Sequence, residues 1–318
     1  MSELILPKYG KLKGITYSET YANGALKACA LDQKNLISTP VGKLIPSYGA
    51  ASARKREGIS LEFFQSGNLK SISLEESVEA NTPLGVLSVE RISFYEDGQI
   101  HRFFPLNGQI NGYWSEEDEY KLAKSIDFDL AIGSFSAKVI SICFYKGGAL
   151  KSLTMWPGER IELLSPDGLV SIRYGFSLYE DGSLKSFEPA LPEPINTPVG
   201  IIIAYDSNAQ GVNADENSVS YDENGTLKSL VTLNSAISIL AGSEKQIIKP
   251  LMKRGKIDPE RFFPEPMKIT FSENEIEIAQ DQDNVIIEDL KKTVVKAIIL
   301  DDTESKACGN CSECSHCG

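Results

Sequence analysis

The sequence predicts a mainly β protein, built from repeated antiparallel β-hairpins that form an elongated sheet or solenoid. Two short phrases support this prediction, because each recurs along the chain and each has the composition of a tight turn. The third observation is that two long segments of the chain align with each other without a gap. One short inserted helix, a small C-terminal cap and a flexible tail complete the predicted architecture.

The first phrase is an aromatic residue, two or three polar or small residues, Gly, any residue, Leu or Ile, Lys and then Ser. Extended sequence on both sides of such a Gly is typical of a tight hairpin in which the Gly takes a positive φ. The residue two positions after the Lys, or after His101 in the third copy, is apolar in every copy. With a period of two, we expect it to share a face with the Lys and to lie opposite the Leu. The six copies begin at Tyr21, Phe64, Tyr95, Tyr145, Tyr179 and Tyr221.

The second phrase, Thr-Pro-x-Gly or Ser-Pro-x-Gly, begins at Thr39, Thr82, Ser165 and Thr197. Pro at the second position of a turn, with Gly two residues later, is a β-turn signal, so each unit is expected to contain two turns and two strands.

Residues 21–71 also align on residues 179–229 at an offset of 158, with 16 identities in 51 positions. The chain therefore looks built by duplication of hairpin units. Such units stack on their neighbours because none can bury an apolar face alone.

We expect residues 1–242 to form the β-hairpin repeat domain. One unit in it is interrupted by a helix at about residues 115–125. Ser115 can cap the start of this helix, and the acids that follow occupy the first turn, where the helix dipole favours negative charge.

The repeat phrases stop after about residue 242. Residues 243–300 read as a connector and a β-rich cap, with a hairpin around Glu273–Glu275. One or two further strands follow, with a helix over Val285–Lys292 as the alternative for part of that segment. Residues 301–318 form the cysteine-rich tail.

The phrase YEDGSLKS, from Tyr179, resembles one half of the MORN-variant repeats of bacterial hairpin-repeat proteins. The resemblance covers the six short phrases, and it implies successive antiparallel hairpins in an elongated, twisted sheet with a binding or scaffolding role. The second, glycine-rich half of the family's repeat is missing here and Thr-Pro-x-Gly stands in its place, so the antitoxin role of some family members is not carried over.

The charge balance argues against two classes of partner. Lys and Arg number 32 against 44 Asp and Glu, which gives a formal net charge of -12. Nucleic acids and anionic lipids are bound through cationic groups, so we expect neither a nucleic-acid nor a membrane partner. The sequence has no secretory signal and no apolar run long enough to span a membrane, which predicts a cytoplasmic protein. In that reducing compartment, clustered thiols favour metal or redox chemistry over disulfides.

The tail contains the strongest candidate site, a C-x-x-C-x-x-C-x-x-C array. Four thiolates form a normal structural shell for zinc, although zinc sites usually separate their two cysteine pairs by many residues. The first three cysteines also have the spacing of a ferredoxin-type iron–sulfur run. The third alternative is a tail that binds soft metals only adventitiously. The candidate ligands are Cys308, Cys311, Cys314 and Cys317, with His316 as a substitute.

Other chemical candidates have simpler structural explanations. We expect Cys29 and Cys143 to be small core residues. His101 replaces the Lys of its repeat and is expected on a strand surface, although any histidine-based catalysis would have to use it. The acids Glu116–Glu119 are expected to be a solvated helix start and Arg54–Arg56 a solvated loop.

We therefore expect a non-enzymatic scaffold that binds a protein partner and has a metal-binding tail. A redox or electron-transfer protein with an iron–sulfur cluster or dithiol in the tail is the alternative, and an enzyme that uses His101 is a further one.

Overall fold

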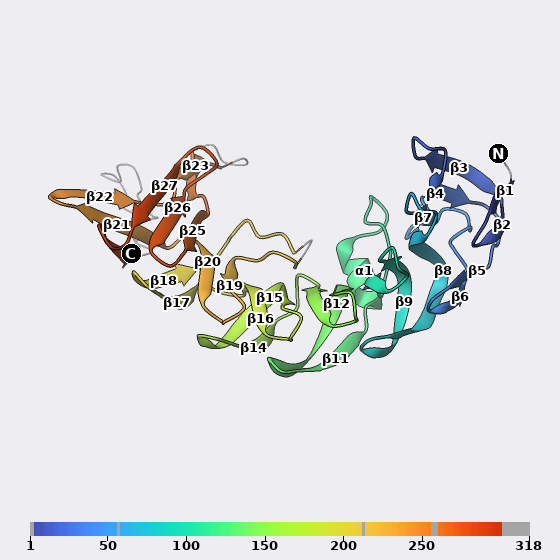
Figure 1. Cartoon of the computed structure of the whole chain (residues 1–318), viewed down its shortest axis with the longest axis horizontal. Helices are drawn as coiled ribbons and strands as arrows, with labels where there is room; N and C mark the ends of the chain where they lie inside the picture. Colours follow the sequence, from blue (N-terminus) through green and yellow to red (C-terminus); the bar gives the residue numbers. More distant parts are fainter. Residues whose placement is uncertain (1–2, 56–57, 212–213, 256–259, 301–318) are drawn as a thin grey trace, which may run out of the picture. The chain divides into compact units, whose positions relative to one another are not determined.

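The computed structural model describes residues 3–55, 58–211, 214–255 and 260–300. These residues confirm the predicted mainly β architecture of repeated antiparallel hairpins (Figure 1). The chain divides into two compact units. Unit 1 comprises Met1–Ile161, Arg173–Ser183 and Gly211–Asp215, and unit 2 comprises Glu162–Ile172, Leu184–Gln210 and Glu216–Gly318. Among the described residues, no helix is long and apolar enough to cross a membrane.

Unit 1 contains the first thirteen strands and, within the described residues, the single helix of the chain. The strands are β1 Glu3–Leu6, β2 Gly10–Lys13, β3 Ile15–Thr20, β4 Leu26–Leu31, β5 Ile37–Thr39, β6 Gly42–Leu44, β7 Leu61–Phe63, β8 Leu69–Thr82, β9 Gly85–Phe94, β10 Ile100–Phe104, β11 Ser125–Leu130, β12 Gly133–Phe144 and β13 Leu150–Met155, and the helix is α1 Glu116–Leu122. Strands β14 Ile161–Ser165 and β15 Gly168–Leu178 contribute residues to both units.

Unit 2 contains the remaining strands, which are again joined as antiparallel pairs. They are β16 Leu184–Pro189, β17 Glu193–Thr197, β18 Gly200–Ala204, β19 Val219–Tyr221, β20 Leu227–Thr232, β21 Ser235–Ala241, β22 Glu244–Ile248, β23 Met252–Arg254, β24 Phe262–Pro264, β25 Met267–Phe271, β26 Glu275–Ala279, β27 Val285–Asp289 and β28 Val294–Ile299.

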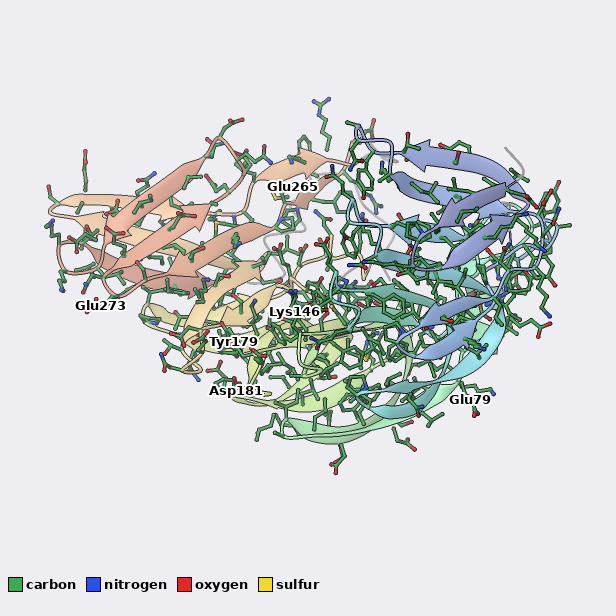
Figure 2. All side chains as sticks on the ribbon, turned by 45° about the vertical axis from the view of Figure 1, so that its right-hand side comes forward. Glu79, Lys146, Tyr179, Asp181, Glu265 and Glu273 are labelled. Carbon is green, nitrogen blue, oxygen red and sulfur yellow. The ribbon has the colours of Figure 1, made fainter. Side chains whose placement is uncertain are left out.

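The turns of the first phrase have the predicted geometry. In the copy at Tyr21, the Gly24 N–H donates to the Tyr21 carbonyl at 2.9 Å and the Tyr21 N–H donates to the Ala25 carbonyl at 2.8 Å. This is a three-residue hairpin loop with Gly in the left-handed region. The repeat glycines of all six copies have φ between +77° and +92°. The turn at Asp181 is one of these loops and is labelled in Figure 2.

The sixth copy is shifted by one residue relative to the expected phrase. Asp222, not Tyr221, takes the place of the aromatic residue, because the Asp222 N–H donates to Thr226 and the Gly225 N–H donates back to Asp222. Tyr221 occupies the position before the turn, where it is buried like Phe63 in the second copy. The sequence alignment at an offset of 158 likewise pairs Tyr221 with Phe63.

The hydrogen bonds of the two long segments repeat at the same offset. Within unit 1, the Ser47 N–H donates to Ser73 at 2.8 Å, and within unit 2 the Tyr205 N–H donates to Val231 at 2.9 Å. The Ser73 N–H in turn bonds to Ser60, and the Val231 N–H bonds to Ser218. The segments that align in sequence therefore fold alike.

The repeat Lys lies in a β-bulge. In the hairpin of β3 and β4, which contains the first copy, Glu19 lies opposite Ala28 and Thr20 lies opposite Leu26, so Lys27 is an extra residue that lies opposite no residue of β3. The register shifts in the same way at four other copies. The five bulge residues are Lys27, Lys70, His101, Lys151 and Lys228.

The bulge makes one expectation wrong, namely that the apolar residue two positions after the Lys shares a face with the Lys and lies opposite the Leu. The extra residue shifts the period of two by one position, so Leu26 and Cys29 lie opposite Thr20 and Ser18 on one face of the strand pair. Both Leu26 and Cys29 are buried, whereas Lys27 is exposed and pairs with Glu19 at 3.0 Å. The Leu and the apolar residue after the Lys therefore belong to the same core.

Two continuous rows of directly opposed residues cross the sheet of unit 1 as a result. The apolar row is Cys29, Leu61, Ile72, Ile92, Phe103, Ile142, Leu153 and Phe176, each at most 1% exposed. The neighbouring row lies on the other face and is Ala28, Glu62, Ser71, Ser93, Arg102, Cys143, Ser152 and Ser177. The phrase "Leu-Lys-Ser" thus specifies one core residue, one bulge and one small residue of the second row.

Tyrosine hydroxyls link successive hairpins of unit 1. The Tyr21 hydroxyl donates to the Phe63 carbonyl at 2.9 Å, Tyr95 donates to Phe144 at 2.8 Å and Tyr145 donates to Leu178 at 2.9 Å. Each acceptor is the residue immediately before the first residue of the next turn. The aromatic residue of the phrase therefore supplies a contact between repeats.

The C-terminal segment continues the hairpin pattern. The hairpin expected around Glu273–Glu275 is confirmed, because β25 and β26 pair on either side of Ser272–Asn274. The alternative helix over Val285–Lys292 is wrong. Its first five residues form β27, in which Ile287 pairs with Glu277 of β26, as suits a β-branched run. Residue 242, the expected domain boundary, lies in the turn between β21 and β22, and the tail lies outside the described residues.

Removing one tyrosine hydroxyl should weaken unit 1 measurably. We expect Tyr145→Phe to lower the free energy of unfolding by about 1 kcal/mol, because it deletes the hydrogen bond to Leu178 and changes little else. Urea unfolding followed by circular dichroism measures the change. Tyr113→Phe is the matched control, since Tyr113 is 87% exposed. An equal loss in both variants would contradict a linking role for the hydroxyl.

Candidate functional site

The predicted metal ligands Cys308, Cys311, Cys314 and Cys317 lie outside the described residues. Within the part of the chain that the structure describes, no group of three or more His, Cys, Asp or Glu side chains is placed to hold a metal ion. Cys29 and Cys143 are buried core residues, as predicted. Burial raises the pKa of the Cys29 thiol to about 12, which keeps it protonated and unreactive at neutral pH.

His101 is half-buried at the bulge of the third hairpin. Its Nδ1 lies 3.4 Å from the Ser93 hydroxyl, which is long for a hydrogen bond, and its ring lies 4.7 Å from the ring of Tyr95. Burial, with help from the charges of Arg102 and Lys151, lowers the pKa of His101, so the ring is neutral at pH 7. No carboxylate among the described residues hydrogen-bonds to it.

The acid near His101 binds other partners. Asp215 accepts a hydrogen bond from the Arg102 guanidinium at 2.6 Å and another from the Ser152 hydroxyl. Burial alone would raise the pKa of Asp215, but the Ser152 hydrogen bond and the Arg102 charge outweigh burial and hold it below its usual range. This arrangement is an ion pair that anchors residue 215 to the second row of the sheet.

A second polar cluster lies at the insertion between β10 and β11, which contains α1. Ser115 caps the helix as predicted. Its hydroxyl accepts from the Asp118 N–H at 3.1 Å, and the Asp118 carboxylate accepts from the Ser115 N–H at 3.0 Å, which completes a capping box. The cap explains why a helix of one or two turns forms in a β array.

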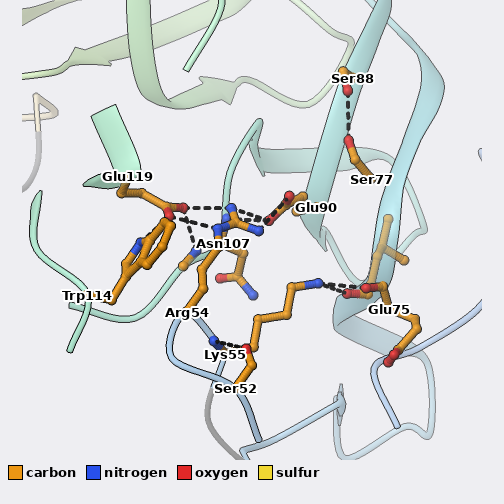
Figure 3. Close-up of polar contacts among 12 residues, drawn as sticks. Ser52, Arg54, Lys55, Glu75, Ser77, Ser88, Glu90, Asn107, Trp114 and Glu119 are labelled. Atoms are coloured by element: carbon orange, nitrogen blue, oxygen red, sulfur yellow. Dashed lines mark hydrogen bonds and ion pairs between the residues drawn. The ribbon is translucent and has the colours of Figure 1, made fainter. Parts of the chain in front are cut away.

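Arg54 fastens this insertion to the sheet (Figure 3). Its guanidinium binds Glu119 of α1 through two contacts of 2.7 and 2.8 Å, and Glu90 of β9 through two contacts of 2.8 and 3.0 Å. Such double forked pairs are the strongest geometry available to an arginine.

Backbone and indole groups complete the cluster. The Gly108 N–H and the Trp114 Nε1–H each donate to Glu119 at 2.7 Å, and the Asn107 N–H donates to Glu90 at 2.9 Å. The insertion is therefore bound through its loop as well as through its helix. We call Arg54, Glu90 and Glu119, with these donors, the Arg54 network.

The Arg54 network corrects two expectations. Arg54 was expected in a solvated loop, but its side chain is only 17% exposed, and Glu119 was expected at a solvated helix start, but its side chain is only 3% exposed. Burial acts to raise the pKa of Glu119, and the hydrogen bonds from Arg54, Trp114 and Gly108 outweigh it and lower that pKa. Glu116 and Glu117 are exposed, as expected.

A second set of contacts also holds α1. The Tyr120 hydroxyl donates to Glu159 at 2.8 Å, and the other oxygen of Glu159 accepts from the Lys138 N–H at 3.0 Å. The Lys138 ammonium lies 4.0 Å from the centre of the Tyr120 ring and donates to the Tyr120 carbonyl at 3.2 Å. Helix α1 is thus fixed to β12 and to the turn after β13.

The insertion is rigidly held and displays apolar side chains to solvent. Ile110, Tyr113 and Leu122 are 54%, 87% and 47% exposed. The insertion and the turn after β13 also form a shallow groove of about 340 Å³, which is lined by Glu116, Glu117, Tyr120, Trp156, Pro157 and Gly158. Exposed apolar side chains that gather into one patch can mark a contact surface. We call Ile110, Tyr113, Leu122 and the groove the insertion surface.

Sequence reasoning found the helix of this site but not its anchor. Arg54 lies 36 positions before Glu90 and 65 before Glu119, and no periodicity connects residues at such separations. The insertion itself was the one feature of the sequence that could have indicated an anchor, because a segment that interrupts a repeat needs contacts that the repeat does not supply. Comparison with family models, with curated proteins and with solved structures found no match to this chain.

Breaking the Arg54 network should be costly. We expect Arg54→Met to lower the free energy of unfolding by about 3–5 kcal/mol, because two buried carboxylates would lose their counter-ion. Urea unfolding measures the loss, and hydrogen exchange of the α1 amides should show the insertion opening first. The control is Lys121→Met, which removes an exposed ion pair with Glu117 and should cost at most about 1 kcal/mol. Similar losses in the two variants would mean that the Arg54 network adds no special stability.

Proposed function

We propose that this chain is a non-enzymatic hairpin-repeat scaffold that binds a protein partner in the cytoplasm and carries a metal-binding tail. The observation that supports partner binding is the insertion surface. Its exposed apolar side chains are held in place by a buried ion-pair cluster, so a partner would meet a pre-organised surface and would order little on binding.

The scaffold part of the proposal follows from the repeats. Each strand that the rows cross contributes one residue to each row, and the hydroxyls of Tyr21, Tyr95 and Tyr145 link neighbouring hairpins. In such an array, the sequence of a segment inserted between two hairpins can change without altering the core that the hairpins share. The third copy is followed by the insertion, and it is there that we place the partner.

Site-specific photo-crosslinking tests the partner site. With a benzophenone amino acid in place of Tyr113, which is 87% exposed, we expect one discrete crosslinked protein in the native host cell. Glu79 is the control position, because it is exposed on β8, away from the insertion in sequence (Figure 2). Equal crosslinking at both positions, or none at either, would contradict the insertion surface as the site.

The tail supplies the second part of the proposal, a soft-metal site formed by Cys308, Cys311, Cys314 and Cys317. Four thiolates suit zinc, and the spacing of the first three cysteines also suits an iron–sulfur cluster.

Metal content tests the tail. We expect about one zinc ion per chain in protein purified without oxygen, and none in a chain that ends at Thr303. Elemental analysis measures both. Iron with acid-labile sulfide in place of zinc would support the redox alternative, and the same metal content in both chains would reject the tail as the site. Because the repeat phrases end well before the tail, we expect the shortened chain to keep its circular dichroism spectrum.

A further inference from the structure

A three-stranded sheet in unit 2 has one face in the core and one face open to solvent. Its strands lie in the order β22, β21, β28, and β21 and β22 are labelled in Figure 1. Ile237 and Ile239 of β21 and Ile248 of β22 lie on the core face, and each is at most 5% exposed. Successive side chains of a strand point to opposite faces, so the residues between these form the open face.

The open face follows from the register of the two strand pairs. Leu240 of the central strand lies opposite Lys245 and Val294, and Ser238 lies opposite Ile247 and Lys296. At one end, Ile298 of β28 also belongs to this face, where it lies opposite the small, buried Ala236. We call the open residues of this face the β21 face, and they are Ser238, Leu240, Lys245, Ile247, Val294, Lys296 and Ile298.

Four apolar side chains of the β21 face are exposed to solvent. They come from three neighbouring strands, and side chains that lie opposite each other on antiparallel strands touch. They therefore gather into one patch, which can mark a contact surface. The four are Leu240 (39% exposed), Ile247 (46%), Val294 (53%) and Ile298 (37%).

The charges of the β21 face are both positive. Lys245 and Lys296 lie on the two outer strands, one on each side of β21, and both are exposed. Neither lysine has an ion pair or a hydrogen bond among the described residues. None of the other side chains of the face is acidic, although the chain has 44 acidic against 32 basic residues. The face thus has the opposite charge to the chain as a whole.

The backbone of the sheet limits what can cover this face. Strand β21 is paired on both sides, so the face offers side chains and no free backbone groups of its central strand. A helix satisfies its own backbone hydrogen bonds and can cover such a face with one apolar stripe. Val294 and Ile298 are four residues apart, which is about 13 Å along the strand, and a helix spans that length with about nine residues.

We propose that the β21 face binds an acidic amphipathic helix of a partner protein. The apolar stripe of the helix would cover Leu240, Ile247 and Val294, and acidic residues on its two flanks would meet Lys245 and Lys296. An anionic membrane fits less well, because two lysines on a chain of net charge -12 give little attraction to a bilayer. This site lies in unit 2 and does not depend on the insertion surface.

A designed peptide tests the proposal on the full-length protein. The probe is a fluorescent peptide of about 18 residues, long enough to form a helix, with Leu along one helical face and Glu on both flanks. We expect saturable binding by fluorescence anisotropy. A second peptide with Gln in place of every Glu keeps the apolar stripe, and we expect it to bind about fivefold more weakly, which is the scale of two exposed charge pairs.

Variants of the protein locate the binding site. Lys245→Gln with Lys296→Gln should weaken binding of the Glu peptide by about fivefold. Its matched control is Lys34→Gln with Lys43→Gln, which removes the same charge from exposed positions of unit 1.

A second variant tests the apolar patch. Ile247→Thr keeps the β-branched shape and should weaken binding of the Glu peptide by about threefold, because less apolar area is covered. Ile287→Thr is its control, since Ile287 is 60% exposed on β27.

Several results would overturn the proposal: no saturable binding, equal binding of the Glu and Gln peptides, or equal losses in a variant and its control. Binding to vesicles of phosphatidylserine and phosphatidylcholine that the Lys245 and Lys296 substitutions abolish would assign the face to a membrane instead. Peptide binding only in a chain that ends at Thr303 would assign the face to the tail. The Tyr113 crosslink should persist in the lysine variant, because the two surfaces are separate.

Discussion

The one-residue bulge at the repeat Lys is the constraint on which the architecture of unit 1 depends. Without it, the Leu of the phrase and the apolar residue three positions later would point to opposite faces. With it, Leu26 and Cys29 lie on one face and small residues such as Ser71 lie on the other. Each strand that the rows cross then adds one member to a continuous apolar row and one to a continuous second row. The Lys is the natural bulge residue because its long chain can leave the crowded strand pair and reach water.

The third copy departs most from the repeat, and the structure accounts for the departure. Where other copies have Lys followed by Ser or Ala, this copy has His101 and Arg102. Arg102 binds Asp215, which lies in the segment between β18 and β19, and Glu90 of β9 binds Arg54, which lies in the segment between β6 and β7. Both of these segments and the helical insertion are therefore anchored at the hairpin of β9 and β10.

How much the sequence predicts depends on how local each feature is. The turn glycines, the capping box at Ser115 and the hairpin after Phe271 are set by neighbouring residues, and all were predictable. The bulge was not, because a shift of one residue leaves the composition unchanged and reverses every face assignment after it. The anchors could not be found at all. Arg54 and Glu119 lie in segments between strands, and they meet only because the order in which the strands pair brings these segments together. The chemistry of the tail stays a prediction that the described residues do not test.

A buried ion-pair cluster is a poor way to gain stability alone, since an apolar core of the same size often does as well. It is a good way to fix one geometry, because a forked arginine satisfies its carboxylates only at the observed distances and angles. For Arg54 that geometry sets the place of α1, and the place of α1 sets Tyr120 and Glu116 opposite Trp156. A repeat that needed only to be stable would gain little from such an insertion. What the insertion adds is a fixed position for the side chains of α1, which is what the proposed contact with a partner requires.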